Sequence, residues 1–268
     1  MTSNILIEAN NISKVYDADV YLKRGINFYA LSSVDFIVEE GDFIAVMGPS
    51  GSGKSTLLNC ISSLDKVTSG NISLLGQPVR VMKDDDLSDF RRKYLGFIFQ
   101  NHNLVSSLSI FDNIATPLIL AKNDINDTYQ RINEIAKTLK IEHILYKKPN
   151  ECSGGEKQRA AIARAIVTRP KLIICDEPTG NLDSENSHEV LSLLSSLNKQ
   201  GIAIVVVTHD SMIASYAKKF MYLRDGTVKT VINRNNASQE EFYEAIVKIT
   251  TQDSLLKKFM KKSGQDDE

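Results

Sequence analysis

A glycine-rich stretch, Gly48 to Thr56, most constrains what this chain can fold into. The apolar run Phe43–Met47 leads directly into it, and a segment compatible with a helix follows. In such a stretch glycines let the backbone turn tightly with its N–H groups facing inward, a lysine reaches the outer phosphates of a ligand, and the next hydroxyl binds Mg²⁺. A helix beginning near Gly53 adds its positive dipole end beneath the phosphates. The flanking strand and helix disfavour a mere surface turn, so the stretch predicts a phosphate-binding loop formed by Gly48, Ser50, Gly51, Ser52, Gly53, Lys54, Ser55 and Thr56.

The composition is that of an ordinary globular protein without a strong charge bias. Of 268 residues, 42% are hydrophobic and 24% are charged, which is enough to bury a large core. The net charge of -1 disfavours a generally basic nucleic-acid-binding protein. No apolar run approaches the roughly 18 residues that a spanning helix needs, and Met1 to Asn10 lack the pattern of a signal peptide. We therefore expect a cytoplasmic protein that does not act on nucleic acid.

The cysteines give little reason to expect a disulfide or a metal centre. Cys60, Cys152 and Cys175 are an odd set without a C-x-x-C pair, which favours neither a disulfide framework nor a zinc site. We expect Cys60 and Cys175 to be small core residues.

Two segments that precede the loop have the pattern of antiparallel strands. Residues 5–9 and 30–39 alternate in part and are rich in β-branched and aromatic side chains. Between them, Asp17 to Phe28 has the character of an exposed insertion. Tyr16, at the end of the first segment, could stack on a flat base or could be a half-buried strand residue, and its position alone leaves both open.

Three continuous apolar runs separated by helical stretches indicate a parallel sheet covered on both faces. They are Phe43–Met47, residues 172–175 and residues 202–207. Because ligands of such sheets bind at the carboxyl ends of the strands, the polar residues that follow the runs should surround one phosphate. After the second and third runs these residues are Asp176, Glu177, Thr208, His209 and Asp210.

The middle third of the chain has a mostly helical pattern. Between residues 84 and 167 apolar residues recur at intervals of three and four, apart from an aromatic, β-rich stretch at 94–99. We interpret 84–167 as a helical subdomain inserted into an α/β core formed by 1–83 and 168–235. The helices expected in it span residues 84–93, 110–121, 126–139 and 157–167.

The tail, 236–268, is predicted to be a helical extension. Ser238 and Glu241 fit a capping box, and a second short helix is expected from Ser254, with four lysines near its end. That helix could lie on a membrane surface or on a partner, or it could pack on its own domain with a solvated basic end. The second alternative is favoured.

Two further motifs are directed at phosphate. An aspartate directly after an apolar strand, such as Asp176, holds Mg²⁺ through water, and the adjacent Glu177 fits a base that orients or deprotonates the attacking water. The paired glycines of Ser153-Gly154-Gly155 precede a helix whose free N–H groups suit an anion. The chain thus carries two helix N-termini that suit phosphate.

Together these motifs resemble the ATP-binding cassette (ABC) ATPases, over residues 5 to about 230. The resemblance implies a P-loop NTPase (RecA-like) α/β core with a parallel sheet, an antiparallel β subdomain and the inserted helical subdomain. It implies ATP and Mg²⁺ as cofactors and hydrolysis of ATP. It also implies a head-to-tail homodimer in the ATP-bound state, because the Ser-Gly-Gly signature of one chain contacts the γ-phosphate held by the other.

The resemblance assigns a role to each matching residue. Tyr16 takes the position of the aromatic that stacks on adenine, but the insertion leaves Phe28 or Tyr29 as the alternative. Cys152 stands where the signature usually opens with leucine, and we expect only a mild effect on packing. The implied catalytic residues are Lys54, Glu177 and His209, the metal ligands are Ser55, Gln100 and Asp176, and the other nucleotide contacts are Ser153, Gly155, Asp183 and the phosphate loop.

Within the family, three stretches are similar to the branch that serves macrolide export, lipoprotein release and peptide-antibiotic detoxification. They are residues 64–70, 97–101 and 176–183, and the tail after Gly226 is similar to bacitracin-resistance transporters. The implied partner is a separate membrane permease, which would hold the chain at the inner face of the cell membrane and could link it to a sensor kinase. We expect a groove near residues 100–118 to grip a cytoplasmic helix of that permease.

The expected function is therefore that of an ATPase subunit that powers a permease, for antimicrobial-peptide resistance or export. The alternative is a mechanotransmitting complex, such as a cell-division regulator, or a lipoprotein-releasing complex, without conventional substrate transport. An ATPase acting on DNA or ribosomes would carry two cassettes or a long coiled coil, and this chain has neither. A module that binds ATP without hydrolysing it is disfavoured by the presence of Glu177 and His209.

Overall fold

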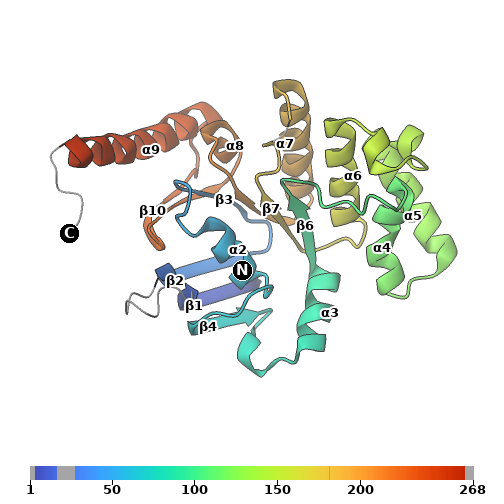
Figure 1. Cartoon of the computed structure of the whole chain (residues 1–268), viewed down its shortest axis with the longest axis horizontal. Helices are drawn as coiled ribbons and strands as arrows, with labels where there is room; N and C mark the ends of the chain where they lie inside the picture. Colours follow the sequence, from blue (N-terminus) through green and yellow to red (C-terminus); the bar gives the residue numbers. More distant parts are fainter. Residues whose placement is uncertain (1–3, 17–27, 181, 263–268) are drawn as a thin grey trace.

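The computed structural model describes residues 4–16, 28–180 and 182–262 (Figure 1). Within these residues the central sheet has six strands, in the order β10 (Thr227–Asn233), β9 (Lys219–Arg224), β3 (Phe43–Met47), β8 (Ala203–Val207), β7 (Leu172–Asp176) and β6 (Leu95–Phe99). All neighbouring pairs in this sheet are parallel except β10 with β9 at one edge. The predicted parallel α/β sheet is confirmed.

The apolar runs are continuous because the central strands are covered on both faces. Every residue of β3 and β8 is buried. Alternate residues of one strand enter different cores: Val205 packs with the helix that follows the phosphate loop, and Val206 packs with the helices of the opposite face. A strand with two buried faces needs apolar side chains at every position, which is the pattern in the sequence.

A second, antiparallel sheet packs against the first. Its order is β2 (Phe28–Glu39), β1 (Ile5–Tyr16), β4 (Ser69–Leu74) and β5 (Gln77–Pro78). The two predicted antiparallel strands are confirmed, and β1 is longer than expected because its pairing with β2 continues to Tyr16. The insertion expected at Asp17 to Phe28 lies outside the described residues, except that Phe28 begins β2.

The helices lie close to their expected positions, with one exception. Helix α6 begins at Gly154, three residues before the predicted Lys157, because Ser153 caps it and both glycines enter its first turn. The described helices are α2 (Lys54–Ile61), α3 (Asp84–Tyr94), α4 (Ile110–Leu120), α5 (Ile125–Thr138), α6 (Gly154–Ile166), α7 (Ser184–Lys199), α8 (Ser211–Ser215) and α9 (Gln239–Lys262). Short 3-10 turns are η1 (Val79–Val81), η2 (Glu142–Ile144) and η3 (Pro149–Glu151).

The range 84–167 contains more than helices. Its helices α4, α5 and α6 lie together at one side of the molecule (Figure 1), but β6, from the same range, pairs with β7 and belongs to the central sheet. One hydrophobic cluster runs from Ile132 in α5 through Ile162 in α6 to Ile173 in β7. The helical portion and the sheet therefore share a core.

The C-terminal extension is one helix where two were predicted. α9 runs without a break from Gln239 to Lys262, and the expected second helix from Ser254 is its last part. The predicted capping box is present, since Ser238 N donates to Glu241 at 2.8 Å and Glu241 N donates to Ser238 Oγ at 3.1 Å. Phe242 and Ile246 are buried, so the first half packs on the domain. In the described ranges, no helix has both the length and the apolar character to cross a membrane.

Candidate functional site

The predicted phosphate loop joins β3 to α2, and its shape requires glycine at two positions. Gly53 has a φ of 100°, and a Cβ there would lie 2.2 Å from the carbonyl oxygen of Ala30. A Cβ on Gly48 would lie 1.9 Å from the carbonyl oxygen of Leu223. Both distances are far below van der Waals contact, so any side chain would push the loop away from the sheets that support it. The glycine spacing in the sequence is therefore a steric requirement of this fold.

Lys54 begins α2 and folds back over the loop. Its Nζ donates to the carbonyl oxygens of Gly48 at 2.8 Å and Pro49 at 2.9 Å. Burial lowers the pKa of the Lys54 ammonium, and the charges of Glu177 and Asp176 act in the opposite direction. Near it, Ser52 Oγ is one of the buried side-chain atoms that lack a hydrogen-bond partner within the described part of the chain. The loop therefore presents a half-buried cation and an unsatisfied hydroxyl, which suit an anionic ligand.

Two carboxylates stand at the carboxyl end of β7, as the sequence predicts. Asp176 Oδ2 lies 3.4 Å from Ser55 Oγ, which donates to it. Burial raises the pKa of the Asp176 carboxyl, and the charge of Glu177 raises it further. Glu177 itself has a φ of 49°, in the left-handed region that few residues other than glycine adopt.

His209 and Glu177 come together because their strands are neighbours. β7 and β8 pair in parallel with Asp176 opposite Val207, so the residues that follow both strands leave the sheet at the same edge. His209 Nδ1 lies 2.9 Å from Glu177 Oε1. The histidine side chain is 73% exposed, whereas that of the glutamate is 15% exposed. One partner of the pair is thus free to meet a ligand while the other is enclosed.

Tyr16 is held by polar contacts and is not packed into the strand core. Its hydroxyl donates to Asp65 Oδ2 at 2.9 Å, and the side chain is 43% exposed. Lys14 Nζ binds Asp65 Oδ1 at 2.6 Å and lies 4.9 Å from the centre of the tyrosine ring. Burial raises the pKa of the Tyr16 hydroxyl, and the side chain of Thr56, in the helix after the phosphate loop, acts in the opposite direction. The tyrosine therefore ends β1 as a partly exposed strand residue, and it lies beside the start of α2.

Gln100 follows β6 and meets the turn after the two carboxylates. A Cβ on Gly180 would lie 3.1 Å from Gln100 Nε2, so the amide packs against this turn. Phe99, the residue before it, pairs with Asp176 across the sheet. The structure thus brings together the phosphate loop, Asp176, Glu177, His209, Tyr16 and Gln100.

The predicted residues Ser153, Gly155 and Asp183 form a second group. Ser153 Oγ accepts from Glu156 N at 3.2 Å, and Ser153 N donates to Glu156 Oε2 at 2.7 Å, which makes a capping box at the start of α6. Asp183 caps α7, where its Oδ1 accepts from Asn186 N at 2.9 Å. Figure 1 shows α6 and α2 well apart on opposite sides of α7 and β7. Within one chain, the start of α6 is therefore separated from the start of α2.

Glu156, which forms the capping box with Ser153, has a strongly lowered pKa. The backbone N–H of Ser153 and the ring of His143, whose Nε2 lies 2.9 Å from Glu156 Oε1, lower its pKa to about 2. The N-terminus of a helix also favours a negative charge. The start of α6 is thus set by a carboxylate that remains ionised at any pH near neutrality.

Cys152 lies directly before this capping box. It is buried, and its Sγ donates to the carbonyl oxygen of Lys148 at 3.4 Å. The three cysteines are buried and free, and Cys60 and Cys175 lie in the core as predicted.

Two residues that matter for the site were missed in the sequence. Asp65 holds Tyr16 from 49 residues away, and no local pattern marks such a partner. Asn186 contacts Asp183 and packs on Gly155, and only its spacing of three from Asp183 could have drawn attention to it.

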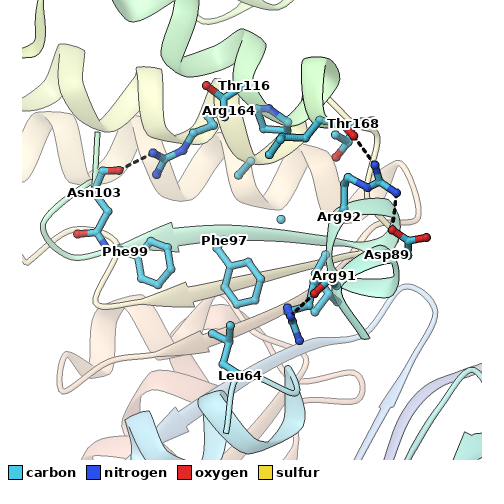
Figure 2. A pocket seen from close by; sticks show the side chains of 16 residues that line it. Leu64, Asp89, Arg91, Arg92, Phe97, Phe99, Asn103, Thr116, Arg164 and Thr168 are labelled. Carbon is cyan, nitrogen blue, oxygen red and sulfur yellow. Dashed lines mark hydrogen bonds and ion pairs between the residues drawn. The ribbon is translucent and has the colours of Figure 1, made fainter. Parts of the chain in front are cut away.

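A groove of about 570 Å³ lies between α3, β6, α4 and α6 (Figure 2). Phe97 and Phe99 of β6 form its floor, and their rings stack at 5.7 Å between centroids. Charged side chains stand at the rim: Arg92 binds Asp89 and the carbonyl oxygen of Leu120, and Arg164 donates to Asn103 O at 2.5 Å. The groove thus has an apolar floor and a basic rim, near the range where the sequence predicts one.

Comparisons with known proteins agree with this geometry. The family model described as "ABC transporter" matches residues 31–180. The ATP-binding protein YvcR of Bacillus subtilis is 43% identical over 244 residues, with 90% of this chain and 92% of that protein covered. The bacitracin export ATP-binding protein BceA of Halalkalibacterium halodurans is 40% identical over 244 residues, with 91% and 94% covered.

The solved structures agree as well. A dimeric structure of a post-hydrolysis state of the ATP-binding cassette MJ0796, bound to ADP and Pi, matches with a TM-score of 0.78 and 37% identity. The match covers 85% of this chain and 98% of that one. MJ0796 comes from Methanocaldococcus jannaschii.

A phosphate loop on a parallel sheet, with two carboxylates at the end of a strand two places away, defines a nucleotide-hydrolysing fold. The chain belongs to the ABC transporter family. It is an ATP-binding subunit of that family and an ATPase, and its fold is the P-loop NTPase fold that the sequence predicts.

The perturbed carboxylate at the start of α6 gives a stability test. A depressed pKa stabilises the folded state above the carboxyl's unfolded pKa of about 4.5, and this stabilisation is lost as the pH falls toward about 2. Glu156→Gln should therefore lower the free energy of unfolding at pH 7, and its deficit should shrink at pH 4 and below. Urea unfolding at both pH values measures this. Glu134→Gln is the control. Among the described residues, the Glu134 carboxylate accepts a side-chain hydrogen bond only from the neutral amide of Gln130, so this variant should have the free energy of unfolding of the wild type at both pH values.

Proposed function

We propose that this chain powers a separate membrane permease in resistance to, or export of, antimicrobial peptides. The geometry that supports its energy-supplying role is the enclosed Glu177 carboxylate, 2.9 Å from the exposed His209 and next to the phosphate loop. The peptide class rests on similarity to a bacitracin export ATP-binding protein over most of both chains. A lipoprotein-releasing or mechanotransmitting complex is the alternative, and permease-side measurements distinguish them.

In this proposal the phosphates of ATP lie over the loop from Gly48 to Thr56. Lys54 exchanges its bonds with the carbonyl oxygens of Gly48 and Pro49 for the phosphate oxygens, which are stronger acceptors because they are charged. The ring of Tyr16 stacks on adenine, and Asp65 and Lys14 fix the orientation of that ring.

Mg²⁺ fits the oxygen donors that stand beside the loop. The hydroxyl of Ser55 and the carboxylate of Asp176 lie 3.4 Å apart, and hydroxyl and carboxylate oxygens are ligands that Mg²⁺ prefers. Asp176 is also partly buried and has a raised pKa, so a nearby cation would favour its ionised form. We assign Ser55, Asp176 and Gln100 as the ligands. When bound, the ion neutralises charge on the β- and γ-phosphates.

Glu177 and His209 have different roles in hydrolysis: Glu177 is the base, and His209 contacts the γ-phosphate. Glu177 accepts a proton from water as the water oxygen bonds to the γ-phosphorus, and the bond from that phosphorus to the bridging oxygen breaks, which gives ADP and phosphate. His209 contacts the γ-phosphate through its exposed ring and holds the Glu177 carboxylate in place through Nδ1.

The second group of residues completes the site of another copy. Ser153 and Gly155 lie at the start of α6 and Asp183 lies at the start of α7, and a head-to-tail homodimer brings them to the ATP of the partner. The dimeric structure of the related cassette MJ0796 supports this arrangement. ATP then bridges both chains, so binding closes the dimer and hydrolysis releases it.

The groove floored by Phe97 and Phe99 is assigned to a cytoplasmic helix of the permease. Its apolar floor suits the apolar face of a helix, and the arginines at its rim suit acidic residues beside that face. Docking there would hold the chain at the inner face of the membrane. A sensor kinase is assigned only through the permease.

Glu177→Gln should slow ATP hydrolysis by roughly 10²- to 10⁴-fold, because a positioned base is lost, while ATP binding persists. With ATP the variant should form a stable dimer. Phosphate release and light scattering after size exclusion measure the two effects. Turnover at the wild-type rate would refute the base assignment.

Two variants, compared with the wild type in a titration with ATP, test where the nucleotide binds. Lys54→Ala should lose affinity and remain monomeric. Tyr16→Ala should weaken binding roughly tenfold or more through lost base stacking, whereas Tyr29→Ala, which changes an exposed residue on the neighbouring strand, should not. Unchanged binding by Lys54→Ala would count against the phosphate loop.

The groove assignment is tested with Leu120, which lines the groove and is 62% exposed. Leu120→Asp should reduce co-purification with the permease and transport roughly tenfold or more, because a charge is placed against an apolar helix face, while basal hydrolysis stays near normal. Ile125→Asp is the matched control: Ile125 is 71% exposed and lies outside the groove. Unchanged co-purification of Leu120→Asp, or an equal loss with Ile125→Asp, would refute the assignment.

The substrate class is tested on the chain co-purified with its permease. Bacitracin or a related peptide antibiotic should stimulate hydrolysis several-fold over the basal rate, with the Glu177→Gln complex as the background. Stimulation by a lipoprotein alone, or by neither, would refute the peptide assignment and favour the alternative complexes.

A further inference from the structure

Asn186, in the first turn of α7, lies between two exposed segments that the proposed dimer presents to a second copy. One segment is Asp183, the cap of α7, and the other is the start of α6 with Ser153 and Gly154. Asn186 itself is half-buried, and Gly155 beneath it is buried. The side chain of Asn186 therefore occupies the junction between the two helix starts.

Toward Asp183, Asn186 acts as a double donor. Its backbone N–H binds Asp183 Oδ1 at 2.9 Å, and its side-chain Nδ2 binds Asp183 Oδ2 at 2.8 Å. The first bond is an ordinary helix cap that any residue at this position except proline would supply. The second bond requires a side chain that donates a hydrogen bond, and here the Asn186 amide supplies it, so the orientation of the Asp183 carboxylate depends on Asn186.

Toward α6, the other end of the same amide acts as an acceptor and as a packing surface. Asn186 Oδ1 accepts from the guanidinium of Arg159 at 3.2 Å. A Cβ on Gly155 would lie 2.4 Å from Asn186 Oδ1 and 2.8 Å from its Cγ. The amide therefore rests directly on the signature glycine, and any larger residue at 155 would displace it.

The amide of asparagine is well matched to this junction. Its NH₂ group donates to a carboxylate while its oxygen accepts from a guanidinium. An aspartate at 186 could still accept from Arg159 but would face Asp183 with a like charge, and an apolar residue could do neither. Fixing both segments before association also lowers the ordering cost of binding.

We propose that Asn186 is a positioning residue that holds Asp183 and the signature segment in one fixed arrangement for pairing with a second copy of this chain. The inference rests on the proposed head-to-tail dimer and adds a determinant of its closure. Asn186 acts through Asp183 and Gly155, so its loss affects pairing and leaves ATP binding to the phosphate loop intact.

The test measures pairing and nucleotide binding separately. In the Glu177→Gln background with saturating ATP, Asn186→Asp should raise the dimer dissociation constant by about tenfold or more, since a hydrogen bond to a charged group is replaced by a repulsion. ATP affinity at protein concentrations that keep the chain monomeric should not change. Analytical ultracentrifugation gives the first quantity, and titration calorimetry gives the second.

Glu189→Gln is the matched control. Glu189 also binds Arg159, at 3.2 Å, but it is 54% exposed, and the atoms nearest to a Cβ built on Gly155 belong to Asn186. In the Glu177→Gln background, this variant should dimerise as tightly as the parent variant, which carries Glu177→Gln alone. Weakening equal to that of Asn186→Asp would overturn the inference, because it would point to Arg159 as the determinant.

A second variant and a double variant separate positioning from general stability. Asn186→Ala removes both the donor and the acceptor without adding a charge, and it should weaken pairing even if Asn186→Asp does not fold. Once Asp183 is replaced by alanine, Asn186→Ala should cost little further pairing; fully additive losses would overturn the coupling. A parallel loss of ATP affinity would also overturn it, since that would indicate damage to the fold.

The parent variant distinguishes this inference from the proposed function. If Glu177→Gln alone does not dimerise with ATP, the proposed dimer is wrong and the inference falls with it. If the parent dimerises and Asn186→Asp pairs equally tightly, only the inference is wrong.

Discussion

The parallel register of the central strands is the constraint on which the site depends. Val46, Val207, Asp176 and Phe99 lie opposite one another across four neighbouring strands. All four strands run in one direction, so their carboxyl ends lie side by side. The residues that follow these ends, which are the phosphate loop, His209, Glu177 and Gln100, therefore lie along the same end of the sheet. A slip of one residue would turn every side chain of a strand to the opposite face and separate Glu177 from His209. Such a slip would also put side chains of the wrong volume into both close-packed cores, which disfavours it.

Burial sets the electrostatics of the same edge. It disfavours the charged forms of both Lys54 and Asp176, so their pKa values shift in opposite directions. The attraction between Lys54 and Asp176 opposes both shifts, whereas the charge of Glu177 opposes the shift of Lys54 and adds to that of Asp176. Groups of this kind gain most from a ligand that carries compensating charge. Nucleotide phosphates together with a cation supply both signs at once, which fits the proposed roles of these residues.

The sequence predicts those parts of the site that depend on short-range patterns. Glycine spacing in the phosphate loop, apolar runs ending in Asp176 and His209, and the capping box at Ser238 are local, and the structure has each of them. The start of α6 was misplaced because glycine has a low helix propensity, which the capping box and burial of Gly155 override. The break predicted before Ser254 was wrong, since α9 continues through it. Tyr16 with Asp65 and Gly155 with Asn186 are contacts between distant segments, and no local periodicity encodes such pairs.

Strand β6 contributes to both the groove and the nucleotide site. Its Phe97 and Phe99 floor the groove, and Gln100, the next residue, packs on the turn that follows Glu177. A five-residue strand hydrogen-bonded to β7 along its length is stiff and spans only about 17 Å. A helix bound in the groove and a nucleotide at the carboxyl ends of the strands would therefore contact two parts of one stiff strand. A movement of β6 caused by either ligand would change the position of the residues that contact the other.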